Sequence, residues 1–288
     1  LLQVFVPYHK YVRVLKWLTL SLLAYVAVVF MVNVSWTQVV INTLLPHITL
    51  SEDYITLLVA VFGTTISPYL FFWQASQEVE DMRGSRNIKP LLQAPKNAHT
   101  ELRRVKFDTY IGMGFSNLVA FFIILSTAVT LHTAGITQIN TSAQAAEALR
   151  PIAGNVTFLL FSLGIIGTGM LAVPVLAGSA AYAVAECFDW PEGLEKKADG
   201  AKKFYAIIGL ATIGGVLLDF TPIDPVKGLF WSAVINGVIA IPIMAVMMLM
   251  AVKPEVMGPF VVKKKLYALG WAATALMFVT VVTMFVFW

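Results

Sequence analysis

Long stretches without Asp, Glu, Lys or Arg alternate along this chain with short charged segments. A helix needs about 20 apolar residues to cross a hydrocarbon layer of ~30 Å. The stretches are continuously apolar, without the alternation of barrel strands. We therefore predict an all-α membrane protein in one transmembrane domain, with about seven spans near residues 15–35, 56–77, 108–131, 156–186, 203–221, 228–252 and 266–287.

The composition agrees with this pattern. Of the 288 residues 58% are hydrophobic and only 12% are charged, and the mean hydropathy is +0.79. A soluble domain carries about 25% charged residues. An ordinary soluble enzyme is therefore excluded. The one cysteine also excludes a disulfide scaffold.

The basic residues indicate an orientation, because Lys and Arg resist translocation. With seven spans, alternate connecting segments hold 18 of the 20 Lys and Arg residues. We expect these segments to be cytoplasmic, the C-terminus to lie outside, and the membrane to be a bacterial inner membrane. The net charge of +4 comes from the basic residues of these cytoplasmic segments, so it does not indicate nucleic acid as a partner.

The first residues suggest that the chain is a fragment. Leu1 is not a start methionine, and residues 1–8 resemble the tail of a preceding apolar helix. Basic residues follow this segment, whereas a signal peptide has them in front. We expect at least one further helix upstream.

The second predicted span is interrupted at Gly63-Thr64-Thr65-Ile66-Ser67-Pro68-Tyr69. Pro68 cannot donate to the carbonyl of Thr64 and disfavours helical geometry at Ser67. Unwound carbonyls beside oxygen side chains hold cations in many secondary transporters. A proline-kinked helix whose hydroxyls bond back to the backbone is the equally weighted alternative. Gln74 lies two turns further on the same face.

Few other polar residues fall within the predicted spans. Asn117 and Asn236 would line a pathway or join helices by hydrogen bonds. Asp108, at a span end, is a candidate entrance charge for cations or a proton acceptor, while segment 78–106 is predicted to be a solvated connector. The chain has no phosphate-binding loop, and its histidines avoid the spans, so neither an enzyme nor a resident cofactor is expected.

Residues 63–69 resemble the sixth helix of the natural-resistance-associated macrophage protein (NRAMP) family of divalent metal transporters, which typically reads Gly-Ala-Thr-Ile-Met-Pro-His. The segments that begin at Asp108, Gly167 and Asn236 resemble helices seven, eight and ten of that family. The resemblance implies a LeuT-like fold of inverted repeats, with this chain as helices five to eleven. The family's Asp-Pro-Gly motif on helix 1, which supplies an acidic metal ligand, is absent from this chain.

Two departures affect the implied metal site. Ser67 stands in place of the ligating methionine and Tyr69 in place of the histidine. A thioether favours Mn²⁺, Fe²⁺ or Cd²⁺, whereas a hydroxyl suits harder ions such as Mg²⁺. Proton coupling is in doubt, since tyrosine does not normally titrate near neutral pH.

We therefore expect a secondary transporter that moves a divalent cation (Mg, Mn or Fe) by alternating access. Its partners would be that ion, the lipid bilayer and the missing N-terminal helices. The expected ligands are Thr64, Ser67 and Asn236, and the expected pathway residues are Gly63, Thr65, Tyr69, Gln74, Asp108 and Asn117. A LeuT-like transporter of an organic solute such as an amino acid, or a non-transporting membrane remnant, remains as an alternative.

Overall fold

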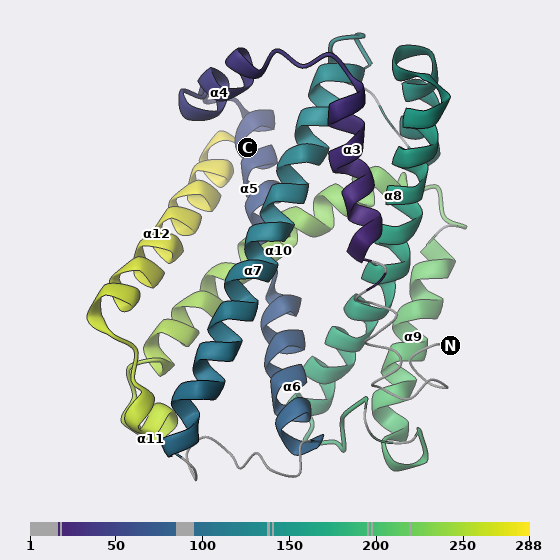
Figure 1. Cartoon of the computed structure of the whole chain (residues 1–288). Coiled ribbons are helices and arrows are strands. Elements are labelled where there is room, and N and C mark those ends of the chain that lie inside the picture. The colour runs from purple at the N-terminus through teal and green to yellow at the C-terminus, as the bar shows by residue number, and fades with distance from the viewer. Residues whose placement is uncertain are drawn as a thin grey trace.

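The computed structural model describes residues 17, 19–84, 95–136, 139, 141–194, 196, 198–218 and 220–288, and every regular element within them is helical. The expected tail at residues 1–8 lies outside these ranges. The elements, labelled as in Figure 1, are η1 (Thr19–Leu22), α3 (Leu23–Met31), α4 (Trp36–Leu44), α5 (Glu52–Thr65), α6 (Pro68–Gly84), α7 (Pro95–Thr127), η2 (Ala128–His132), α8 (Ser142–Cys187), η3 (Ala198–Gly200), α9 (Lys202–Leu218), α10 (Pro225–Met250), α11 (Pro254–Met257), η4 (Gly258–Phe260) and α12 (Lys264–Phe287).

Polar residues in front of the helices fix where several of them begin. Ser51 Oγ accepts a hydrogen bond from the backbone N–H of Tyr54 at 3.4 Å, and two acidic residues follow in the first turn of α5. Asp224 accepts from the N–H of Val226 at 2.9 Å, and Pro225 is the first residue of α10. Such caps satisfy N–H groups that have no partner inside the helix.

Within the described residues, four helical segments are long and apolar enough to cross a membrane by length and composition. They are Ala98–His132, Gly154–Cys187, Pro225–Met250 and Lys264–Phe287. The helices α5, α6 and α9 are shorter, at 14, 17 and 17 residues. Seven crossings therefore stay a prediction, whereas the all-α architecture is confirmed for the described residues.

Two of the long helices contain local irregularities that the sequence did not indicate. The end of α7 winds into a π-helix, η2. Gly154 has a φ of 85° inside α8, so α8 is two helices joined at a kink. A left-handed φ favours glycine because glycine has no Cβ.

The helices pack in groups around separate apolar clusters. One group joins α5, α10 and α12 through residues such as Val59, Ala233 and Val281. Another joins α8 and α9 around Tyr182 and Phe204, with Trp73 of α6 packed against it. The third joins α3, α7 and α8. A fourth cluster, formed by Ala240 and Met244 of α10 and Met277 of α12, packs against Phe62 of α5 and Phe71 of α6, so α5 and α6 meet around α10.

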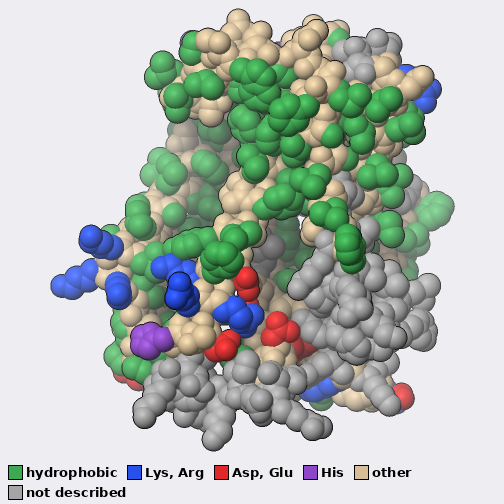
Figure 2. Space-filling view, viewed as in Figure 1, with side chains coloured by type: hydrophobic (Ala, Val, Ile, Leu, Met, Phe, Trp, Pro, Cys, Tyr) green, Lys and Arg blue, Asp and Glu red, His purple; other side chains and the backbone are tan. Residues whose placement is uncertain are grey.

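The surface is polarised along the bundle. Figure 2 shows hydrophobic side chains over the upper and middle parts of one face, whereas most of its charged side chains lie in the lower part. Many large apolar side chains on the long helices are exposed, for example Ile166 at 63% and Leu229 at 68%. Such a band is expected where lipid tails replace water as the solvent.

Candidate functional site

The helix that the sequence predicts to be broken is broken. Helix α5 ends at Thr65 and α6 begins at Pro68, and Ile66, with φ −110° and ψ 66°, leaves the helical geometry between them. The N–H of Ile66 still donates to the carbonyl of Phe62 at 2.7 Å. Because Pro68 has no N–H, the carbonyl of Thr64 loses its usual helical donor.

The hydroxyl of Ser67 takes over that donor role. Ser67 is 0% exposed, and its Oγ lies 2.6 Å from the carbonyl oxygen of Gly63 and 2.9 Å from that of Thr64. A hydroxyl has one proton and two lone pairs, so one proton is shared between two carbonyls. The structure thus brings together two of the predicted ligands, the carbonyl of Thr64 and the hydroxyl of Ser67, in a buried oxygen-rich turn.

The hydroxyls of Thr64 and Thr65 point to a different carbonyl. Each donates to the carbonyl of Val61 at 2.8 Å. Thr64 is exposed and Thr65 is half-buried. Any role of Thr64 at the break therefore belongs to its main-chain oxygen.

Gly63 allows α10 to cross α5 one turn before the break. A Cβ on Gly63 would lie 2.0 Å from the carbonyl oxygen of Ala233 and 2.6 Å from the backbone nitrogen of Gly237. Likewise, a Cβ on Gly237 would lie 2.8 Å from the carbonyl oxygen of Val59. Asn236 is half-buried and next to Gly237 in the chain, so it belongs to the segment of α10 that crosses α5.

The first turns of α6 are held by α8. The carbonyl of Tyr69 accepts a hydrogen bond from Ser179 Oγ at 3.1 Å. Trp73 meets the ring of Tyr182 edge-on, with 6.0 Å between centroids. The small residues around Ser179 thus serve packing and anchoring of the half-helix that follows the break.

A buried carboxylate at the far end of α6 was missed by the sequence reasoning. Glu80 is 4% exposed; it accepts hydrogen bonds from the hydroxyl of Tyr182 and, at 2.9 Å, from the N–H of Leu194. It lies in segment 78–106, which was predicted to be a solvated connector; that is wrong for this residue. The spacing of Trp73, Gln77 and Glu80 could have indicated its burial, because these three residues lie on one face of a helix and Trp73 is apolar.

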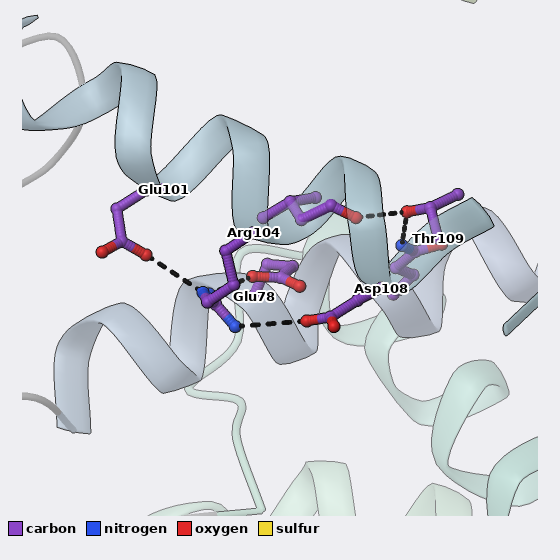
Figure 3. A network of polar contacts seen from close by, with 7 residues as sticks. Glu78, Glu101, Arg104, Asp108 and Thr109 are labelled. Atoms are coloured by element: carbon purple, nitrogen blue, oxygen red, sulfur yellow. Dashed lines mark hydrogen bonds and ion pairs between the residues drawn. The ribbon is translucent and has the colours of Figure 1, made fainter. Parts of the chain in front are cut away.

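Gln74 and Asp108 belong to a polar network between α6 and α7 (Figure 3). Gln74 Nε2 donates to Thr109 Oγ1 at 2.9 Å. Arg104 forms ion pairs with Glu78 at 2.9 Å, Glu101 at 3.1 Å and Asp108 at 3.7 Å. Glu78 follows Ser67 by 11 residues, which is about 16 Å of helix. This network is therefore distant from the break and joins the two helices.

Asn117 lies exposed on α7. Within the described ranges, no three His, Cys, Asp or Glu side chains are grouped so that they could hold a metal ion. The oxygen atoms at the break, from two carbonyls and one hydroxyl, are all neutral. Neutral oxygens alone suit hard cations that keep part of their water shell.

Comparison with known proteins gives a family match over nearly the whole chain. A family model described as "Natural resistance-associated macrophage protein-like" matches residues 1–287. The divalent metal cation transporter MntH of Clostridium acetobutylicum is 26% identical over 157 residues, which are 54% of this chain and 34% of that protein. The protein of the same name from Acidiphilium cryptum is 23% identical over 249 residues, 84% of this chain and 51% of that protein. The matches thus cover about half or less of these curated relatives.

Proposed function

Since the chain belongs to the natural resistance-associated macrophage protein (Nramp) family of integral membrane proteins, we propose that it moves divalent metal cations across a membrane by alternating access. The break between α5 and α6 is the part of the ion pathway that this chain contributes. Both MntH relatives are named as divalent metal cation transporters. Mg²⁺, Mn²⁺ and Fe²⁺ are the ions to test first.

The observation that carries this proposal is the buried turn at Ser67. Its hydroxyl shares one proton between two carbonyls, at 2.6 and 2.9 Å, so its oxygen lone pairs are not used by these bonds. The hydrogen bond to the carbonyl of Thr64 is the longer of the two, so this carbonyl oxygen is held less tightly than that of Gly63. A cation that approaches this turn can therefore meet the hydroxyl oxygen of Ser67 and the carbonyl oxygen of Thr64 together.

Access to this pair requires a conformational change. Ser67 is completely buried, and Tyr69, two residues later, is fixed to α8 through its carbonyl. An ion reaches Ser67 only when α6 shifts relative to α5 or when the crossing helix α10 withdraws. Such alternate exposure of a midpoint site is what alternating access requires.

The serine predicts relaxed selectivity towards harder ions. An oxygen ligand does not favour Mn²⁺ or Cd²⁺ over Mg²⁺ in the way that a thioether does. In cells that express the complete gene, uptake of radioactive Mn²⁺ and Cd²⁺ relative to Mg²⁺ should rise several-fold in the variant Ser67→Met. Ser116→Met, at an exposed position of α7, is the matched control and should leave the ratio unchanged. An unchanged ratio in Ser67→Met means that Ser67 is not a ligand.

The orientation has its own test. We place the basic segments in the cytoplasm, as the distribution of Lys and Arg favours. Cys187 is the one cysteine of the chain and is exposed at the end of α8. A membrane-impermeant maleimide should label it in inverted vesicles and spare it in intact cells. Labelling in intact cells reverses the orientation.

A further inference from the structure

Helix α4 is amphipathic, and its polar residues, although exposed, lie with Val39 on the side that lines a cavity against α7. Gln38, Asn42 and Thr43 line a cavity of about 420 Å³ whose other wall is the end of α7, including Phe121 and Leu125. Asn33 and Ser35, just before the helix, continue this polar lining. A helix on the surface of a soluble protein shows the opposite arrangement, with its apolar stripe towards the core.

The apolar side of α4 faces outward. Trp36, Val40 and Leu44, which follow one another at spacings of four residues, are 46%, 54% and 74% exposed, and Ile41 beside them is 50% exposed. The segment after the helix continues this surface, with Leu45, Ile48 and Leu50 between 67% and 72% exposed. Residues 17–51 contain no Asp, Glu, Lys or Arg. No charge therefore opposes the transfer of this surface out of water.

This surface is continuous with the apolar exterior of the long helices. Phe30 at the end of α3 lies 6.2 Å from Trp36 and 6.3 Å from Phe122 of α7, measured between ring centroids. In Figure 1, α4 lies at the same end of the bundle as the C-terminus. There Trp288 stacks on Trp231 at 5.9 Å. Tryptophan is enriched at membrane–water interfaces.

From these contacts we propose that α4 and the segment up to Leu50 form a monotopic anchor in the membrane–water interface. The side with Trp36, Val40 and Leu44 enters the lipid, and the side with Gln38 and Asn42 keeps a wet polar cavity against α7. An amphipathic helix binds an interface in proportion to the apolar area that it buries. Lipid is the occupant because the exposed surface joins that of a membrane-spanning helix through Phe30.

The proposal can be tested by site-directed spin labelling in vesicles of phosphatidylethanolamine and phosphatidylglycerol. Cys187→Ser removes the native thiol. Single cysteines at Val40 and Leu44 then report on the outward side, and cysteines at Gln38 and Asn42 report on the cavity side. All four positions are exposed in the structure, so labels there disturb little packing.

The expected result is a contrast between the two sides. Labels at 40 and 44 should collide more with oxygen, which concentrates in lipid, and labels at 38 and 42 more with a water-soluble nickel chelate. High nickel collision at all four sites places α4 in water and overturns the proposal. Low collision with both reagents at 40 and 44 means that protein covers this side. Loss of that protection on dilution with lipid then identifies a second copy as the cover.

Discussion

The close crossing of α5 and α10 makes the variant Gly63→Ala a sensitive test of the structure. The added Cβ would lie 2.0 Å from the carbonyl oxygen of Ala233, whereas ordinary contacts to a Cβ begin at 3.4 Å. The obstructing atoms are backbone, so no side-chain rotation relieves the overlap. The two helices must therefore separate by more than an ångström.

The expected magnitude follows from two opposing effects. Overpacking a close-packed interior costs about 1–3 kcal/mol, and an obstacle made of backbone belongs at the upper end of that range. Replacing glycine by alanine inside a helix returns about 1 kcal/mol of helix propensity. We therefore expect a net destabilisation of about 2 kcal/mol.

The assay is unfolding of the purified protein by SDS in mixed micelles, with two matched controls. Gly112→Ala and Gly114→Ala make the same chemical change in α7, where a Cβ meets nothing within 4 Å. These two control substitutions should leave the free energy of unfolding unchanged or raise it slightly. If Gly63→Ala unfolds at the same SDS fraction as the controls, α5 and α10 are not in backbone contact, and Asn236 does not lie on a segment that crosses α5.

The remaining predictions concern three other polar contacts and use the same unfolding assay. Ser67→Ala removes the donor that the carbonyls of Gly63 and Thr64 share and should lower the free energy of unfolding by about 1–3 kcal/mol, while Ser116→Ala should leave it almost unchanged. Tyr182→Phe removes a donor to the buried Glu80; in a double-mutant cycle with Glu80→Gln the two changes should be coupled by about 0.5–3 kcal/mol, and simple additivity would show that the contact is not energetically important. Arg104→Gln should cost less than about 1 kcal/mol because its side chain is 42% exposed, and 1 M salt should abolish the difference; a large salt-independent loss would mean that the network in Figure 3 is buried in the protein.

The position of the helix break could be predicted because its cause is local. Pro68 lacks an N–H and restricts Ser67, and both effects act within four residues. What the freed carbonyls would contact was left open between a cation site and a bond from a nearby hydroxyl. In the structure the hydroxyl of Ser67 makes that bond, and its unused lone pairs keep the cation site a proposal.

The features that sequence reasoning missed depend on contacts between distant segments. Glu80 belongs to a run with Glu78 and Asp81 that is typical of a solvated surface, and only the approach of α8 and Leu194 buries it. Helix α4 was hidden because its uncharged stretch is continuous with the predicted first span. The side-chain amides of Gln38 and Asn42 indicate an amphipathic helix only because the structure places them along the cavity against α7.

The glycine contact between α5 and α10 has a mechanical consequence. Interlocked side chains resist sliding and turning, but the atoms of α10 nearest to Gly63 belong to the main chain of Ala233 and Gly237, so no side chain of α10 interlocks with α5 at Gly63. Such a contact can act as a pivot: each helix can tilt about Gly63 if the side chain of Val59, which lies against Gly237, shifts by a small amount. The place where the two helices are nearest is for this reason also the place where they are freest to pivot, one turn away from the oxygens of the break.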